Sequence, residues 1–318
     1  MSAAFGRLPE HRQGLLAVLL AAVLWSSGGL FIKWVSLDAL AITMWRSIFA
    51  LVTVVVVLRP GWVSPRRADR TTWGIALTYA ATLLMFVAAT RLTTAASAIF
   101  LQYTAPLYLL VFGALLLGER ATKLDAATVG VAFCGMALFF VGKLDASAFA
   151  GNALGLASGV ALAAMFLFLR SPKCGPRTRP QAMVLGNGVL VIGLGIVNLA
   201  RADASLFTPG PGDLAALAFL GVVQIGIAYA VFTFGIARVG ALEASLIGML
   251  EPVLNPIWVL IVLDERPGWW AVVGGAIIIS AVAGRTWLSE RRSSPHPPAP
   301  SPDFAGEAEQ TVRTRASP

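Results

Sequence analysis

An acidic residue interrupts a long apolar stretch near the end of the chain. Glu251 stands within ALEASLIGMLEPVLNPIWVLIVLDER, residues 241–266, and Pro252, Asn255 and Pro256 follow it. A carboxylate at membrane depth is costly, and it occurs where it faces protein or a water-filled cavity. Two interpretations follow. Glu251 binds a substrate ammonium group or a proton, or it is a protonated structural residue that bonds the backbone of a neighbouring helix.

The same pattern stands earlier, where residues 95–120 read AASAIFLQYTAPLYLLVFGALLLGER. Pro252 lies 146 positions after Pro106, and the Glu-Arg pair that ends each stretch repeats at the same spacing. This spacing predicts an internal duplication. Because a proline removes one helical hydrogen bond, we expect helix kinks at Pro106, Pro252 and Pro256. A freed carbonyl beside Gln102 would accept a bond from a ligand amine.

Further polar side chains are expected at membrane depth. Uncharged hydrogen-bonding groups there suit a zwitterionic or polar neutral substrate, although each also serves as a bond between helices. Arg46 meets a substrate carboxylate in one interpretation; in the other it extends toward the membrane surface or pairs with a structural carbonyl. The candidate substrate-binding residues are Glu251, Asn255, Gln102, Tyr103, Trp25, Ser26, Tyr79, Thr78, Gln224, Tyr229 and Arg46.

Composition places the chain among membrane proteins. Of its 318 residues, 57% are hydrophobic and 13% are charged, which excludes a soluble domain. The formal net charge is +8, but the positive residues lie in loops and tails, and no basic face interleaved with aromatic residues indicates nucleic acid. Both histidines, His11 and His296, lie in the tails, so the interior lacks the groups that an intramembrane enzyme or a metal site would use. We expect no cofactor and no metal ion.

The apolar segments predict an all-α membrane protein with ten transmembrane helices. A span needs about 20 apolar residues. The expected spans are 14–35, 40–58, 73–89, 95–117, 126–142, 151–170, 182–199, 214–236, 241–263 and 269–288. The expected domains are an N-terminal tail at 1–13, a first five-helix repeat at 14–142, a second at 151–288, and a disordered proline-rich tail at 289–318.

The charges in the loops predict the orientation. Arginine and lysine residues cluster in the tails and in every second loop, whereas each of the other loops carries one. The positive-inside rule then places both termini in the cytoplasm. Five spans per half is an odd number, so the second half must enter the membrane in the opposite direction. Such inverted repeats place a substrate site near the midplane, at their interface.

Several sequence features together resemble a known family. The sequence WSSGGLFIK at Trp25 to Lys33, the Trp45-Arg46 pair and the Leu-Glu-Pro around Glu251 are similar to the drug/metabolite transporter superfamily and its EamA-type members. The resemblance covers residues 14–288. It implies export of small metabolites, often amino acids. We expect a location in the inner membrane and transport by alternating access of the two inverted halves. The expected partners are a small-molecule substrate, a coupling proton and the lipid bilayer, with the chain acting as a monomer or homodimer.

Other functions stay open at this point. A broad exporter of drugs or quaternary amines would use a carboxylate with aromatic residues, and Glu251 with Trp25, Tyr103 and Trp258 is compatible with that function. A channel would need a pore built from several copies or from repeated filter loops, and the sequence shows no such loops. An intramembrane enzyme is the third alternative.

Overall fold

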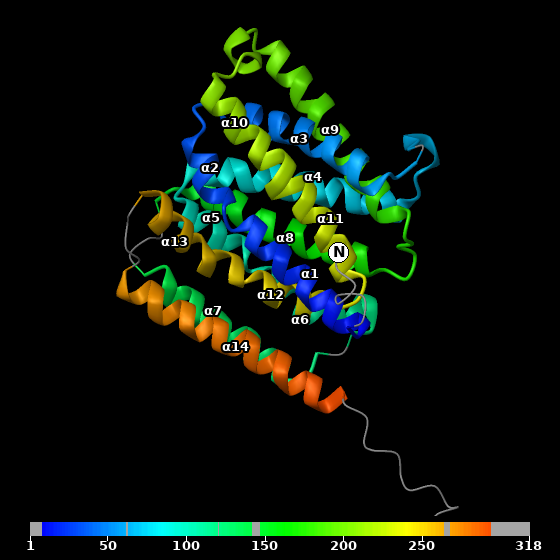
Figure 1. Ribbon diagram of the computed structural model, residues 1–318, viewed down its shortest axis with the longest axis vertical. Coiled ribbons are helices and arrows are strands. Elements are labelled where there is room, and N and C mark those ends of the chain that lie inside the picture. Colours follow the sequence, from blue (N-terminus) through cyan, green and yellow to red (C-terminus); the bar gives the residue numbers. More distant parts are fainter. Residues whose placement is uncertain (1–7, 62, 120, 142–146, 264–267, 294–318) are drawn as a thin grey trace, which may run out of the picture. The chain divides into compact units, whose positions relative to one another are not determined.

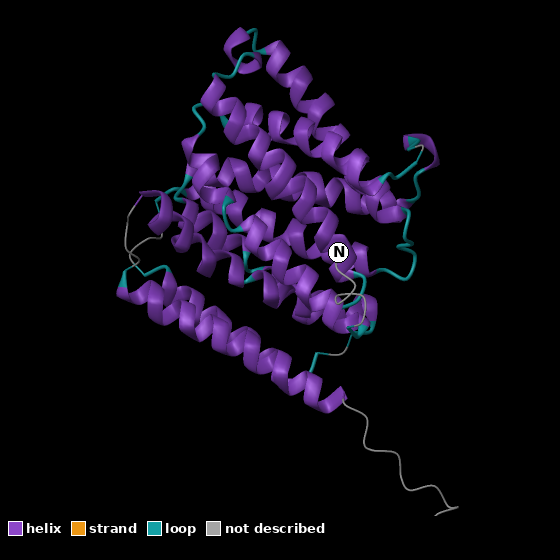
Figure 2. Ribbon diagram, in the orientation of Figure 1, coloured by secondary structure: helices purple, strands orange, loops and turns teal. Residues whose placement is uncertain are grey.

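The structure is a computed structural model that describes residues 8–61, 63–119, 121–141, 147–263 and 268–293. Parts of several predictions lie outside these residues: most of both tails, and the second Glu-Arg pair, Glu265-Arg266. The described residues form helices joined by loops, and they contain no strand (Figure 2). Contacts divide the chain into two units, residues 1–282 and 283–318, and the site described below lies in the first.

Seven α-helices make up the first half of the chain (Figure 1). They are α1 (Glu10–Trp25), α2 (Gly28–Trp34), α3 (Ala39–Leu58), α4 (Arg70–Leu92), α5 (Ala95–Gln102), α6 (Ala105–Leu117) and α7 (Lys123–Phe139). A short 3-10 turn, η2 (Pro65–Arg67), precedes α4.

The second half begins with two uninterrupted helices, continues with two interrupted ones and ends with a single helix. It consists of α8 (Phe149–Arg170), α9 (Thr178–Ala200), the 3-10 turn η3 (Ala204–Phe207), α10 (Pro211–Phe219), the π-helix η4 (Leu220–Ile227), α11 (Ala228–Ile236), α12 (Ala241–Gly248), α13 (Leu250–Leu263) and α14 (Trp269–Ser293). Helices of the two halves pack against each other: α4 contacts α8 and α9, α3 contacts α9 and η4, and α1 contacts α11.

The predicted membrane class is confirmed. In the described part of the chain, eight stretches are long and apolar enough to cross a bilayer: Glu10–Trp34, Ala39–Leu58, Arg70–Leu92, Ala95–Leu117, Phe149–Arg170, Thr178–Ala200, Pro211–Ile236 and Trp269–Leu288. The two other predicted spans are shorter helices. α7 has 17 residues, and α12 is separated from α13 at Met249.

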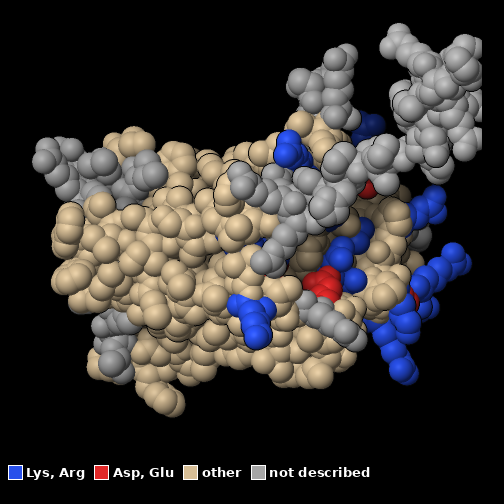
Figure 3. Space-filling model, turned by 90° about the horizontal axis from the view of Figure 1, so that it is seen from below, with Lys and Arg blue, Asp and Glu red and all other residues tan. Residues whose placement is uncertain are grey.

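Large apolar side chains cover much of the surface. Leu115, Leu116, Ile192 and Leu199 each expose about two thirds or more of their side chains. In water this exposure would oppose folding, but in a bilayer these side chains contact lipid. The face drawn in Figure 3 is accordingly mostly free of charge, with its Lys, Arg, Asp and Glu side chains confined to parts of it.

Two of the helix interruptions lie four residues before a proline. A proline lacks the N–H that would bond the carbonyl of the residue four positions earlier. For Pro106 that residue is Gln102, where α5 ends, and for Pro252 it is Gly248, where α12 ends. The missing bonds therefore coincide with breaks at equivalent positions in the two halves. Helix α13, by contrast, continues through Pro256.

Two further interruptions occur without a proline. Between α1 and α2, the hydroxyl groups of Ser26 and Ser27 donate to the carbonyl oxygens of Val23 at 2.6 Å and Leu24 at 3.1 Å. Such bonds compete with the backbone bonds of a helix. The π-helix η4 interrupts the helix formed by α10 and α11, and π-helical turns occur often at functional sites.

Candidate functional site

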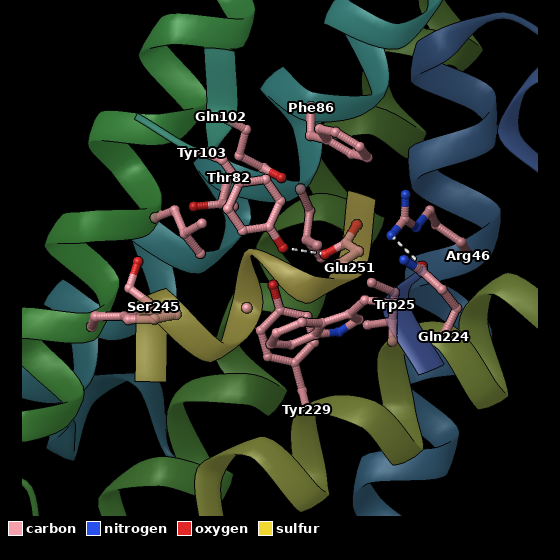
Figure 4. Close-up of a pocket in the computed structure, with 15 residues that line it drawn as sticks. Trp25, Arg46, Thr82, Phe86, Gln102, Tyr103, Gln224, Tyr229, Ser245 and Glu251 are labelled. Carbon is pink, nitrogen blue, oxygen red and sulfur yellow. Dashed lines mark hydrogen bonds between the residues drawn. The ribbon is translucent and has the colours of Figure 1, made fainter. Parts of the chain in front are cut away.

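Helices from both halves of the chain, most of the interrupted ones among them, surround a small cavity, which we call the central cavity. The volume in which the centre of a water molecule can lie is about 40 Å³. Seven of the predicted residues line it: Trp25, Arg46, Gln102, Tyr103, Gln224, Tyr229 and Glu251. Figure 4 shows them pointing toward the same space from α1, α3, the end of α5, η4, α11 and α13. This volume holds a few water molecules, so a larger solute requires the helices to separate.

Glu251 supplies the carboxylate of the central cavity. Its side chain is buried, and it accepts a hydrogen bond of 2.5 Å from the hydroxyl of Tyr103 (Figure 4). Tyr103 follows the last residue of α5, and Glu251 lies in the first turn of α13. The two helix breaks therefore bring one residue from each half of the chain into contact. A helix N-terminus also favours a negative charge in its first turn.

Arg46 supplies a positive charge on another wall. Only 1% of its surface is exposed, so it does not extend toward the membrane surface. Its Nη2 atom donates to Gln224 Oε1 at 2.9 Å, and within the described chain Nε and Nη1 have no partner. Burying an incompletely bonded guanidinium is costly, and an anionic ligand group in the cavity would offset that cost.

Aromatic rings form the rest of the wall. Trp25 packs against Tyr229 with ring centroids 4.9 Å apart, and against Phe232 at 5.0 Å. The indole Nε1 of Trp25 is buried and has no partner within the described chain. It is therefore a further donor available to a ligand.

Three of the predicted residues are not part of the lining. The hydroxyl of Ser26 accepts a bond of 2.7 Å from Trp258 Nε1. Thr78 bonds the carbonyl of Gly74 in its own helix at 2.6 Å. The hydroxyl of Tyr79 accepts a bond of 3.0 Å from the amide of Asn187. The side chains of Asn255 and Pro256 lie outside the described part of the structure.

The lining also contains residues that the sequence reasoning did not select: Thr82, Leu83, Phe86, Leu162, Phe166, Ile225, Ser245 and Gly248. Thr82 lies one helical turn after Thr78, on the same face of α4. Ser245 has a buried hydroxyl without a partner among the described residues. Gly248 lies three residues before Glu251, so helical spacing from Glu251 is a signal that indicates it.

At one end of the helices, Glu119 links three segments in a cluster that we call the Glu119 bridge. Its Oε1 accepts from Arg170 Nε at 2.9 Å, and its Oε2 accepts from the backbone N–H of Ala241 at 3.0 Å. Arg170 also donates to the carbonyl oxygen of Ala237 at 3.4 Å. The carboxylate thereby connects the segment after α6 to the end of α8 and the start of α12.

The described residues contain no group of three or more His, Cys, Asp and Glu side chains arranged to hold a metal ion. The polar groups of the central cavity instead suit an organic solute. Glu251 offers an acceptor for an ammonium group, and Arg46 offers donors for a carboxylate.

Comparisons with known proteins agree with this arrangement. The EamA-like transporter family matches residues 12–141 and again 149–286. A protein from Archaeoglobus fulgidus described as an uncharacterized transporter is 26% identical over 272 residues, covering 85% of this chain and 95% of that protein. A solved structure described only as the crystal structure of a protein has a TM-score of 0.69 and 18% identity, covering 87% of this chain and 98% of its own. The last likeness concerns the fold alone, whereas the double family match shows that this chain belongs to the EamA-like transporter family of the drug/metabolite transporter superfamily.

Proposed function

We propose that this protein exports small polar metabolites such as amino acids across the inner membrane, as a secondary transporter. The observation that carries the proposal is the pair of opposite charges in one buried cavity. Arg46 and Glu251 each bond a neutral side chain, Gln224 and Tyr103 respectively. An amino acid carries one carboxylate and one ammonium group, so it would offset both charges at once.

The transport cycle in this proposal is alternating access between two inverted repeats, with both termini in the cytoplasm. The Glu119 bridge supports it, because Glu119 holds the start of α12 and Ser245 of the same helix lines the central cavity. Release of the bridge would free α12 to move and open the cavity at that end. Glu251 would also carry the coupling proton, released when the substrate ammonium binds.

Export is tested by measuring solutes that leave cells overproducing the protein, followed by flux into proteoliposomes. The proposal expects saturable movement that discriminates among amino acids. Replacing Glu251 by Gln should reduce the flux and change its pH dependence, while the amount of protein in the membrane stays the same. Ion conductance without saturation would contradict a carrier and indicate a channel.

A broad exporter of quaternary amines is the second candidate function. The aromatic rings of Trp25 and Tyr229 beside Glu251 favour it, because aromatic faces and carboxylates attract such cations. The buried guanidinium of Arg46 opposes it, because a cation in the same cavity would be repelled. Protection of cells against toxic amino-acid analogues supports the first function, and protection against cationic dyes supports the second.

A further inference from the structure

Gly28, the first residue of α2, lies directly against the side chain of Gln224 in η4. A Cβ atom at Gly28 would lie 2.5 Å from Gln224 Nε2 and 3.0 Å from its Cδ. Contacts below 3.0 Å do not persist, so a residue with a side chain at this position would displace the amide. The glycine therefore leaves the space that Gln224 occupies.

The backbone of η4 is itself fixed by a second close approach. A Cβ atom at Gly221 would lie 2.5 Å from the carbonyl oxygen of Arg46 and 2.4 Å from Phe49 Cβ. Helix η4 thus lies against α3 at the position that carries Arg46. With the backbone held in this way, the amide end of Gln224 is the part that can move.

The same amide bonds the buried guanidinium of Arg46. Gln224 Oε1 accepts from Arg46 Nη2 at 2.9 Å, and both side chains are buried (Figure 4). A guanidinium is planar, so a bond that fixes one of its nitrogen atoms also fixes where the others point. Displacing the amide would leave Arg46 without this restraint.

We propose that Gly28 is a positioning residue of the substrate site. It makes room for the amide of Gln224, which aims the guanidinium of Arg46 at the central cavity. Part of this inference rests on the proposed function, namely that a substrate carboxylate binds the aimed guanidinium. The positioning itself concerns contacts that exist without substrate, and it is tested separately.

A double-mutant cycle tests the positioning without any ligand. The four proteins are the wild type, Gly28→Ala, Gln224→Ala and the double variant, with Gly188→Ala as control because a Cβ there meets open space. In the wild-type background Gly28→Ala should lower the melting temperature in detergent by roughly 2–4 °C, since Arg46 loses a bond. Only the end of a flexible side chain must move, so the protein should still fold.

In the Gln224→Ala background, the new methyl group at residue 28 no longer meets an amide. Gly28→Ala should then cause no further fall in the melting temperature. Gly188→Ala should change the melting temperature by the same amount in both backgrounds. An equal shift from Gly28→Ala in both backgrounds would overturn the inference, because the glycine would then act through α2 packing alone.

Proteoliposome uptake of L-alanine tests the consequence for transport. Gly28→Ala and Gln224→Ala should each raise the apparent KM roughly tenfold with little change in maximal rate, and together no more than either alone. A fall in maximal rate at constant KM would contradict the positioning role. If the wild type moves no amino acid, the proposed function fails, and the melting temperatures still decide whether Gly28 positions Gln224.

Discussion

Replacing Glu119 by Gln tests whether the Glu119 bridge keeps one end of the cavity closed. The substitution preserves size and removes the charge. At present the two carboxylate oxygens accept from Arg170 at 2.9 Å and from the N–H of Ala241 at 3.0 Å. An amide has a single acceptor oxygen, so it cannot make both bonds with separate oxygens. We expect the variant to open this end more often.

The expected size of the change in opening follows from the solvent exposure of Arg170 and Glu119. The side chains of Arg170 and Glu119 are 28% and 26% exposed, so water screens their attraction. Such a pair contributes roughly 0.2–1 kcal/mol, and a negative charge at the N-terminus of a helix contributes roughly 0.3–1 kcal/mol. A loss of about 1 kcal/mol changes an equilibrium about fivefold.

Cysteine labelling at Ser245 measures the opening. Ser245 is 2% exposed and lines the central cavity, so a cysteine there should react slowly while the cavity is closed. Cys134 and Cys174 are first replaced by Ser. A membrane-impermeant maleimide is then applied to each face of oriented vesicles. From the face at which α12 begins, Glu119→Gln should raise the labelling rate about fivefold.

The control for this experiment is Asp69→Asn. The Asp69 carboxylate accepts bonds from Thr72, within the first turn of the helix that it caps, and so should not affect access to residue 245. Equal labelling rates in the wild type and Glu119→Gln would refute the reasoning, provided that both proteins melt at similar temperatures. A higher labelling rate from the opposite face of the vesicles would also contradict the reasoning.

Two predictions concern stability. Gly186→Ala should destabilise the protein by roughly 1–3 kcal/mol in thermal unfolding, because its Cβ would lie 2.6 Å from the ring of Tyr79, whereas Gly188→Ala, with open space around it, should change little. Asp69→Ala should cost roughly 0.5–2 kcal/mol through loss of the helix cap, seen as a lower melting temperature at neutral pH. Hydrogen bonds from Thr72 hold the pKa of Asp69 below its ordinary value of 3.8. The contribution of the Asp69 cap to the stability of the protein is therefore fully present above pH 3.8. It is lost as the pH falls through the lowered pKa, and a difference between wild type and variant that persisted at lower pH would contradict this account.

Sequence patterns predicted the spans closely where apolar length defines them. The expected segments 40–58 and 95–117 correspond to α3, Ala39–Leu58, and to α5 with α6. Helix α4 is longer than the expected 73–89, because Asp69 caps it before the apolar residues begin. Hydropathy reports the part of a helix that crosses hydrocarbon, and it contains no information on how far the helix extends beyond it.

The chemical properties of individual residues predicted part of the site. The helix breaks before Pro106 and Pro252 follow from an N–H group that each proline lacks, and the residues around them, Gln102, Tyr103 and Glu251, line the cavity. The break at Ser26 and the π-helix η4 have no such signal. They depend on competition between side-chain and backbone bonds and on close packing by glycines, which only the folded structure reveals.

The sequence also could not predict which turn of a regular helix reaches the central cavity. Thr78 and Thr82 lie on the same face of α4, and only the second reaches the cavity. Periodicity identifies a face of a helix, and the turn that meets the cavity depends on how neighbouring helices pack. Arg46 illustrates the same point, since its contact with Gln224 joins residues of different halves.

The central claim is that solute binds between Arg46 and Glu251. The most direct measurement is the apparent KM for uptake of the identified solute by proteoliposomes carrying Arg46→Gln, Glu251→Gln or the control Thr78→Val, at equal amounts of folded protein. We predict that each of the first two raises the KM at least about tenfold, since each removes a charge-assisted bond, and that the control matches the wild type. Wild-type KM values in both charge variants would contradict the account.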